Sequence, residues 1–544
     1  MTGPAPSPTT GTRPHAVTTA HALEEDTLRT WHDHLPAGRQ LSAEDLTAGG
    51  TLLRQWTDGW RARPEAPLWL DARTDPPGPV RGSAHDRAGP GRWWTAGAFA
   101  EATERVAGRL QGAGLVPGDR VVWSTGSTVT ALAAHVGALR AGLVVVPMNT
   151  AYSRREVAHI VGDVRPAAAI VERSDQASWI RDASSRPLVV VGPSVELPEA
   201  APGPLDDAAP DDPALIGYTS GTTGSPKGAV LSHRNLLAGT TSVRVAWRWD
   251  QDDRLVHCLP VFHAHGLCVG VYGTLLAGAS AVLLPGFEPA AVADAVRGHD
   301  ATLFFGVPTM YHRLASAGRV GELRRTRLCV SGSAPLPAEL HARVSAALGS
   351  PVLERYGMTE TLMNVSNPVD GERRAGTVGF PLPGVDVLLA PDGEILVRGP
   401  NVFAGYWERP EATAASFTPA ADGGAAWFHT GDLGQDVDGY LVIRGRSKEL
   451  IISGGFNVYP GEVEAVLASH PRVAEAAVTG SLSEEWGEVV TAWIVPDGEP
   501  PSLEELVAFT ASELASYKRP RIVHVVDRLP RNALGKVVRG QLGR

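Results

Sequence analysis

The chain has 544 residues, 43% of them hydrophobic and 20% charged, so it is long enough to bury more than one core and to fold into several domains. Its formal net charge of −10 and its isoelectric point near 5.9 argue against a nucleic-acid-binding protein, because such proteins usually present a basic face. The 3 cysteines, at positions 258, 268 and 329, do not have the spacing of a disulfide framework and favour a reducing compartment.

The N-terminal residues lack an apolar stretch of signal-peptide length, so we expect a cytoplasmic protein. One uncharged segment, Gly266 to Phe287, is long enough to span a bilayer. Several glycines and Pro285 interrupt this segment, and Ala-Gly-Ala-Ser at 277–280 is typical of a turn. We therefore predict a buried helix followed by a buried strand, and no membrane span.

Residues 1–50 are rich in Pro, Thr and His without a firm periodicity, which predicts a partly disordered N-terminal extension. A helical pattern starts within Leu41 to Trp60, and residues 75–92 form a Pro/Gly-rich loop. From Trp93 to Val171, helical segments alternate with short apolar runs, which indicates an α/β fold with largely parallel strands. The predicted helices lie within 99–110, 129–140 and 154–163, and the predicted strands are 120–123, 144–147 and 167–171.

The same alternation returns from Arg254 to about Glu354, after an acidic, Pro-rich connector at 193–213. Beyond Gly384 the apolar runs are short and strand-like, as in a small β subdomain. The last part of the chain, from Ser447, has the mixed helix and strand pattern of a compact α+β unit. The predicted architecture is α/β: a large N-terminal domain of two α/β subdomains plus a small β subdomain, residues 51–446, and a small α+β C-terminal domain, residues 447–544.

The strongest motif runs from Tyr218 to His233 and reads YTSGTTGSPKGAVLSH. A strand precedes it, and a helix with Ser232 as its N-cap follows it. Such a small-residue loop brings backbone N–H groups, hydroxyls and the charge of Lys227 close to an anion, as in a triphosphate site. It is not a P-loop, because no Gly directly precedes Lys227 and no Ser or Thr follows it. The alternative interpretation is a flexible Ser/Gly linker.

Further motifs follow this loop in a defined order. Each is weak alone, since Thr-Glu pairs open helices and Gly-Asp pairs make turns. Together they form one set: RYGMTE at 355–360, TGD at 430–432, GRSKE at 445–449, SGGFNVYPGEVE at 453–464 and PRNALGKVVR at 530–539. With the phosphate loop, over roughly residues 90–544, this set resembles the acyl-adenylate-forming enzymes: acyl-CoA synthetases, adenylation domains of peptide synthetases and luciferases.

The resemblance implies a two-step ligase that uses ATP, Mg²⁺ and CoA. The first half-reaction makes an acyl-adenylate, and the small domain then rotates about a hinge near Lys448 to admit the thiol. It implies catalytic roles for Lys536, Glu360, Thr219 and Lys227, with Glu360 and Thr219 close to Mg²⁺, and a CoA channel along Gly454 and Gly455. It implies nucleotide-binding roles for Ser220, Gly221, Thr222, Thr223, Gly224, Gly332, Ser333, Ala334, Glu354, Tyr356, Gly357, Thr359, Asp432 and Arg446.

Two arginines suggest which carboxylic acid is the substrate, because they lie in segments that border the acyl pocket in relatives. An alkyl pocket should not hold the guanidinium of Arg355, because an unpaired buried charge is costly, whereas a second substrate carboxylate would pair with it. The segments that contain Arg355, Arg313 and His263 resemble those of malonyl-CoA synthetases, which implies malonate, with methylmalonate as a further substrate. The alternative for either arginine is an internal salt bridge or a surface position.

Three other functions stay open at this point. The enzyme could activate a short or medium monocarboxylic acid, or it could load a carrier protein supplied in trans. A non-catalytic nucleotide-binding module is a third alternative, against which the joint presence of the four catalytic candidates weighs. A zinc site among His257, Cys258, His263, His265 and Cys268 is disfavoured by their spacing, and we expect His263 to line the acyl pocket instead.

Overall fold

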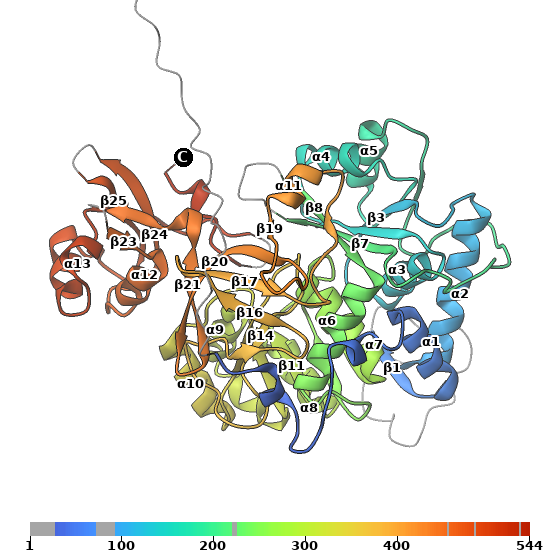
Figure 1. Ribbon diagram of the computed structural model, residues 1–544, viewed down its shortest axis with the longest axis horizontal. Coiled ribbons are helices and arrows are strands. Elements are labelled where there is room, and N and C mark those ends of the chain that lie inside the picture. The colour runs from blue at the N-terminus through green and yellow to red at the C-terminus, as the bar shows by residue number, and fades with distance from the viewer. Residues whose placement is uncertain are drawn as a thin grey trace, which may run out of the picture.

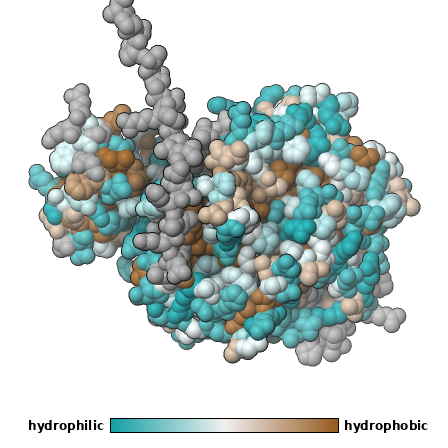
Figure 2. Space-filling model, in the orientation of Figure 1, coloured by the Kyte–Doolittle hydropathy of each residue, from teal (hydrophilic) through white to brown (hydrophobic). Residues whose placement is uncertain are grey.

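The computed structural model describes residues 28–71, 93–219, 226–453, 456–483, 486–532 and 535–543. Figure 1 shows a large body, coloured blue to orange, and a smaller red unit at one side of it. On the face shown in Figure 2, hydrophilic residues predominate over the large body and hydrophobic residues are scattered among them. The arrangement confirms the predicted α/β fold with a large N-terminal and a small C-terminal domain.

The first sheet of the large domain has the strand order β18-β8-β7-β4-β3-β5-β6. Its strands from β7 to β6 pair in parallel, while β8 and β18 add antiparallel neighbours at one edge. Strands β3 to β5 confirm the predicted ones and are apolar because helices cover both faces of a parallel sheet. The strands are β3 Arg120–Ser124, β4 Val144–Pro147, β5 Ala168–Val171, β6 Val189–Val191, β7 Pro213–Thr219, β8 Lys227–Ser232 and β18 Gly405–Tyr406.

The second sheet has nine strands in the order β15-β14-β13-β12-β11-β9-β10-β1-β2. Its central part, from β13 to β1, is parallel. The strands are β1 Pro67–Leu70, β2 Trp93–Thr95, β9 Arg254–His257, β10 Ser280–Leu283, β11 Leu303–Gly306, β12 Leu328–Ser331, β13 Leu353–Tyr356, β14 Val365–Ser366 and β15 Phe380–Pro381.

Helices flank both sheets, and they are α1 Leu52–Ala62, α2 Ala96–Gly112, α3 Val129–Arg140, α4 Arg154–Val164, α5 Ser174–Ala183, α6 His233–Ala246, α7 Tyr272–Ala277, α8 Pro289–Gly298, α9 Pro308–Ser316 and α10 Ala338–Leu348. Helix α6 begins directly after the phosphate-loop motif. The predicted N-cap is confirmed: the Ser232 hydroxyl accepts from the Asn235 backbone N–H, and the Asn235 side chain accepts from the Ser232 backbone N–H. Gly266 to Phe287 contains a π-helix (His265–Val271), α7 and then β10, as predicted.

A third, antiparallel sheet forms the small β subdomain from β16 Asp386–Leu389, β17 Glu394–Arg398, β19 Phe417–Thr418, β20 Trp427–Val437 and β21 Tyr440–Arg446, with α11 Pro410–Ala414 beside it. The C-terminal unit has its own sheet and its own core around Val463, Leu467 and Ile494. Its elements are β22 Ile451–Ser453, β23 Phe456–Val458, β24 Val473–Ser483, β25 Gly487–Pro496, β26 Ile522–Val525, α12 Pro460–Ala468 and α13 Leu503–Phe509.

The N-terminal segment packs against the large domain where the structure describes it. Leu28, His34 and Leu46 are buried, and the Arg29 guanidinium lies over the rings of Phe380 and Tyr440. Apolar side chains in residues 28–50 thus find a partner surface on the folded domain, while the partly disordered extension over residues 1–50 stays a prediction. Residues 1–27 and 72–92, which include the predicted loop, lie outside the described residues. Within the described part of the chain, no helix is long and apolar enough to cross a membrane.

Candidate active site

The candidate phosphate site lies where β7, β8 and β18 meet the loop after β13. Thr219 ends β7 and pairs with Lys227, which begins β8. The Thr219 hydroxyl donates to Glu360 Oε1 at 3.3 Å, and the Tyr406 hydroxyl donates to the same oxygen at 3.1 Å. The Lys227 ammonium lies 5.0 Å from the centroid of the Tyr406 ring. Tyr406, on β18, was not predicted, because its position depends on pairing between strands far apart in sequence.

Glu360 is buried, and burial raises the pKa of its carboxyl group, while the bonds from Tyr406 and Thr219 oppose that shift. A carboxylate and a hydroxyl form a hard oxygen donor set that suits Mg²⁺, which usually takes few protein ligands and completes its shell with water and phosphate oxygens. A nearby dication would also favour the ionised carboxylate. The donor chemistry of Glu360 and Thr219 therefore fits Mg²⁺.

A second polar group lies around Asp432 at the base of the β20–β21 pair. Tyr356, at the end of β13, donates its hydroxyl to Asp432 Oδ2 at 2.6 Å, and Arg446 donates its Nε to Oδ1 at 3.0 Å. Asp432 itself is 6% exposed. Three motifs that are far apart in sequence thus meet around one carboxylate, which could accept ribose hydroxyls once its neighbours adjust.

The structure brings Lys536 close to this group. Burial lowers the pKa of its ammonium and the Arg446 guanidinium lowers it further, while Asp432 and Glu449 act in the opposite direction. The preceding Gly535 has φ +75° and approaches α9 so closely that a Cβ there would lie 3.0 Å from Thr309 Oγ1. Gly535 therefore combines a left-handed backbone with a close approach to α9, and the adjoining Lys536 lies near enough to Asp432 and Arg446 for their charges to shift its pKa.

Other predicted residues have different positions. Lys448 is exposed in the turn Ser447–Glu449 between β21 and β22. Ser220, Gly221, Thr222, Thr223, Gly224, Gly454 and Gly455 lie outside the described residues. Their roles stay predictions.

The predicted adenine segment follows β12 and has constrained geometry. Ser333 has φ +69°, in the left-handed region, and its hydroxyl lies 3.3 Å from His265 Nδ1. At Gly332 a Cβ would lie 2.4 Å from Arg355 Cζ, and at Gly357 it would lie 2.0 Å from the Leu362 carbonyl oxygen. Larger residues at these two positions would displace Arg355 or the loop that carries Glu360. Ala334 follows Ser333 in this segment, and Thr359 packs against Gly217 on β7.

The hydrogen-bond partners of the Glu354 carboxylate were not predicted from the sequence. Its side chain is 6% exposed, and its two oxygens accept backbone N–H groups of Leu336 at 3.3 Å and of Gly376 at 3.2 Å. Burial raises the pKa of this carboxyl to about 7. Its side chain therefore joins two loops, and the nucleotide-binding role expected for this residue stays a prediction.

Arg355 is the most unusual charge of the site. It is 4% exposed on β13, and its Nε and Nη2 have no hydrogen-bond partner among the described residues. Burial lowers the pKa of the guanidinium to about 9. Burial also lowers the pKa of His263 to about 4 and, further, that of His265, and in both cases Arg355 adds to the shift. At neutral pH the histidines are uncharged, so they leave the charge of Arg355 unbalanced.

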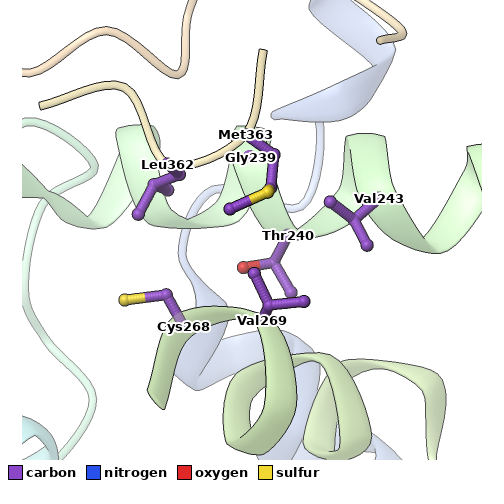
Figure 3. A pocket seen from close by; sticks show the side chains of 7 residues that line it. All are labelled: Gly239, Thr240, Val243, Cys268, Val269, Leu362 and Met363. Atoms are coloured by element: carbon purple, nitrogen blue, oxygen red, sulfur yellow. The ribbon is translucent and has the colours of Figure 1, made fainter. Parts of the chain in front are cut away.

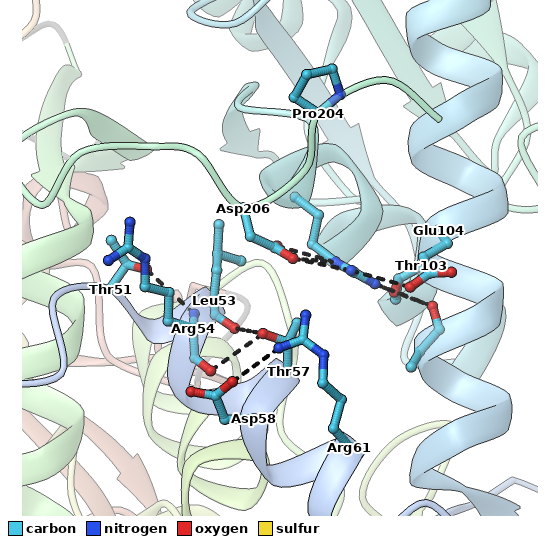
Figure 4. A network of polar contacts seen from close by, with 12 residues as sticks. Thr51, Leu53, Arg54, Thr57, Asp58, Arg61, Thr103, Glu104, Pro204 and Asp206 are labelled. Carbon is cyan, nitrogen blue, oxygen red and sulfur yellow. Dashed lines mark hydrogen bonds and ion pairs between the residues drawn. The ribbon is translucent and has the colours of Figure 1, made fainter. Parts of the chain in front are cut away.

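Arg140 shows how this chain treats a buried arginine that is purely structural. It is also 4% exposed, but its Nε and Nη2 donate to Asp206 at 3.1 and 3.0 Å, and its Nη1 donates to Thr103 at 2.8 Å. Figure 4 shows Asp206, Thr103 and Glu104 joined to this network by dashed lines. An internal salt bridge, the alternative for Arg355, is what Arg140 forms, whereas Nε and Nη2 of Arg355 find no such partner within the described part of the chain.

A small apolar cavity of about 10 Å³ lies beside the loop after Glu360 (Figure 3). This is about the volume needed for one water molecule. The cavity is narrow because α6 approaches the loop closely: a Cβ at Gly239 would lie 2.6 Å from Leu362. It is lined by Gly239, Thr240 and Val243 from α6, Cys268 and Val269 from the π-helix, and Leu362 and Met363 from the loop.

Arg313 does not join Arg355 in this arrangement. It lies exposed on α9, with its guanidinium 4.9 Å from the centroid of the Phe287 ring. Its predicted contact with a substrate carboxylate stays a prediction. The described residues also contain no group of three His, Cys, Asp or Glu side chains that could hold a metal ion, so the disfavoured zinc interpretation gains no support.

Two family models match the chain: "AMP-binding enzyme" over residues 78–407 and "AMP-binding enzyme C-terminal domain" over residues 462–536. A feruloyl-CoA synthase of Amycolatopsis sp is 38% identical over 470 residues, which cover 83% of this chain and 94% of the relative. A malonate–CoA ligase of Arabidopsis thaliana is 35% identical over 485 residues, covering 80% and 79%.

Among solved structures, ATP-bound MatB from Rhodopseudomonas palustris is similar with a TM-score of 0.80 and 37% identity, covering 92% of this chain and 98% of that one. Sequence, fold and site thus agree. The chain belongs to the AMP-binding enzyme family, in its acyl-CoA synthetase branch, and is an AMP-forming acid–CoA ligase that uses ATP, Mg²⁺ and CoA.

Proposed function

We propose that this ligase converts malonate to malonyl-CoA and also accepts methylmalonate. The observation that carries the proposal is the buried guanidinium of Arg355, whose Nε and Nη2 have no protein partner among the described residues. Isolated buried charges are strongly unfavourable, so such a group is retained where a ligand supplies the opposite charge. A carboxylate can bind a guanidinium through two parallel hydrogen bonds.

A dicarboxylate fits both requirements of the site. One carboxylate must face the α-phosphate of ATP, and the other must reach Arg355, which precedes Tyr356 of the ribose group by one residue. Malonate is a short acid that carries both carboxylates, and methylmalonate keeps both and adds one methyl branch.

The relatives act on different acids according to their names. Ferulate has one carboxylate, so a feruloyl-CoA synthase at 38% identity argues for a monocarboxylate pocket, whereas the malonate–CoA ligase at 35% identity argues for malonate. Identity alone does not separate them. Arg355 favours malonate, because a monocarboxylate in this pocket would leave the guanidinium unpaired in a buried site.

In the first half-reaction, a carboxylate oxygen of the acid attacks the α-phosphorus of ATP, the bond to the bridging oxygen breaks, and pyrophosphate leaves. We assign Thr219 and Lys227, with residues 220–224, to the phosphates, and Lys536 to the carboxylate and α-phosphate. Tyr356, Asp432 and Arg446 would hold the ribose, and Gly332–Ala334, Gly357 and Thr359 would border the base. Glu360 and Thr219 would hold Mg²⁺, which supplies charge neutralisation on the phosphates.

In the second half-reaction, the CoA thiolate attacks the acyl carbonyl carbon, and AMP leaves with the electron pair of the broken C–O bond. We propose that the domain of residues 447–544 rotates about Lys448, removing Lys536 and placing Gly454 and Gly455 along the thiol channel. The electrostatic coupling of Lys536 to Asp432 and Arg446 supports an adenylation-competent arrangement in this structure. The likeness to ATP-bound MatB supports the same arrangement.

The test is thioester formation with ATP, Mg²⁺ and CoA, using malonate, methylmalonate, acetate, butyrate, octanoate and ferulate in parallel. We expect turnover with malonate and methylmalonate and little with the monocarboxylates. Arg355→Gly should lower kcat/KM for malonate by about a hundredfold, because a buried charge pair is lost. Arg355→Lys should recover little, because an ammonium cannot make the paired contact.

A second variant, Arg313→Ala, removes an exposed guanidinium from helix α9 and tests the other predicted carboxylate contact. A large loss in this variant would support the predicted second carboxylate contact. Preference for ferulate or octanoate, with Arg355→Gly unchanged, would contradict the malonate assignment but not the ligase. Pyrophosphate release without a CoA thioester would instead indicate a carrier protein as the acyl acceptor.

A further inference from the structure

A buried carboxylate lies beside the candidate phosphate site, on a helix outside the motifs. Asp163 is near the end of α4, and its side chain is 10% exposed. Its Oδ2 accepts from the Tyr218 hydroxyl at 2.5 Å, and its Oδ1 accepts from Arg409 Nη2 at 2.6 Å. Tyr218 directly precedes Thr219, and Arg409 follows Tyr406 by three residues. One carboxylate therefore joins the two segments whose hydroxyl groups bond to Glu360.

His159 lies one turn earlier on the same face of α4, four residues before Asp163. Its Nε2 donates to the Pro226 carbonyl at 2.9 Å, and its ring meets the Tyr218 ring edge-on, with centroids 6.2 Å apart. Pro226 directly precedes Lys227. Helix α4 thus contacts the residue before Thr219 on β7 and the residue before Lys227 on β8.

We propose that His159 and Asp163 are positioning residues of the nucleotide site. They hold α4 against Tyr218 and Pro226, and so fix the position of the paired ends of β7 and β8, from which Thr219 and Lys227 meet the phosphates of ATP under the proposed function. Neither residue contacts the reacting atoms. The residues that they contact, Tyr218 and Pro226, each lie one position before Thr219 or Lys227 in the chain. A small shift of these neighbours would displace the two side chains, and transition-state contacts are sensitive to small displacements.

The inference concerns the ATP side of the reaction and does not depend on which acid is activated. A merely structural role predicts lower stability with unchanged kinetic constants. A positioning role predicts a higher KM for ATP and a lower kcat with a nearly unchanged KM for the acid. These two readouts separate the alternatives.

The experiment compares His159→Ala, His159→Gln, Asp163→Ala and Asp163→Asn in the full-length enzyme. KM and kcat are measured by ATP–pyrophosphate exchange with the best acid, and thermal unfolding is recorded for each variant. The matched control is Arg154→Ala, which removes the ion pair with Asp182 from the same helix, where both side chains are more than half exposed. We expect His159→Ala to raise KM for ATP about tenfold and to change KM for the acid less than about twofold.

His159→Gln should recover most of the lost ATP affinity, because its amide group can donate to the Pro226 carbonyl. Asp163→Asn should fall between wild type and Asp163→Ala, since it keeps an acceptor for Tyr218 but loses the charge facing Arg409. If Asp163→Ala does not fold, the two His159 variants and Asp163→Asn decide the question. Unchanged KM for ATP in these three variants, or losses equal to those of Arg154→Ala, would overturn the proposal.

Discussion

Two arginines with the same burial illustrate how single residues distinguish structure from function here. Arg140 is surrounded by acceptors from α2 and from the connector before β7, so its charge is satisfied within the fold. Arg355 has neutral histidines as neighbours, and its Nε and Nη2 have no hydrogen-bond partner among the residues that the structure describes. A buried ion pair adds little stability, but a buried unpaired ion is costly, so the second arrangement supports the proposal that a substrate carboxylate pairs with Arg355.

Tyr406 is the residue of the phosphate site whose role can be tested most directly. Tyr406→Phe removes the hydrogen bond to Glu360 and keeps the ring beneath Lys227. Without this donor, the Glu360 carboxylate is held less firmly for Mg²⁺. We expect the Mg²⁺ concentration for half-maximal activity to rise about tenfold, as for other partners of metal ligands. The measurement is a Mg²⁺ titration of thioester formation at fixed ATP.

Tyr440→Phe is the matched control for that titration. Its hydroxyl donates to the Glu372 carbonyl at 3.0 Å, away from Glu360. Removing it should leave the Mg²⁺ dependence unchanged. Equal shifts in both variants would contradict a specific role of Tyr406 at the cation site.

At the scale of elements, the site is built from strand ends and the loops that follow them. Thr219 ends β7, Tyr356 ends β13, and Lys227 begins β8. The carboxyl ends of parallel strands gather loops at one edge of a sheet, which is why ligands bind there in open α/β folds. Helix α6 then contributes three of the residues that line the small apolar cavity.

The cap of α6 predicts a measurable stability difference. Ser232 is 4% exposed and forms a capping box with Asn235, whereas Ser153 forms the same motif with Glu156 at the exposed start of α4. Ser232→Ala should lower the free energy of unfolding by about 1–2 kcal/mol, and Ser153→Ala by about 0.5–1 kcal/mol. The denaturant midpoint of each variant gives this comparison. A larger effect of Ser153→Ala would contradict the argument from burial.

At the scale of the whole molecule, buried neutral histidines make the free energy of unfolding depend on pH. Burial lowers the pKa of six of them: that of His135 to about 3, those of His34, His233, His257 and His263 to about 4, and that of His265 well below its usual value. Their unfolded pKa is near 6.5, so the unfolded chain binds more protons between pH 4 and 6.5. These groups contribute full stability above pH 6.5 and lose it as pH falls toward 4.

The denaturant midpoint should therefore fall as pH is lowered from 7.5 to 5. Three groups act in the opposite direction: burial raises the pKa of Glu354 to about 7 and also raises that of Glu360, and the bond to Glu394 raises the pKa of His429. The six buried histidines outnumber them. His135→Asn removes one titrating group and should flatten the pH dependence, although the variant is less stable because the ring bonded to Tyr272 is lost. A midpoint that is constant over this range would contradict the argument.

The sequence by itself determined the α/β class, most strands and helices of the first sheet, the N-cap of α6 and the motifs of the nucleotide site. These features depend on local periodicity, capping and residue order, which a linear pattern contains. Only the tertiary structure decided the surroundings of the charged groups: that Nε and Nη2 of Arg355 have no partner among the described residues, that Glu354 joins two loops, that Tyr406 faces Glu360 and that Arg313 lies over Phe287. Each of these depends on which distant segments meet, and so does the packing of residues 28–50. The free energy of a charged side chain depends on its burial and on its hydrogen-bond partners. Both are established only when distant segments of the chain come together in the fold.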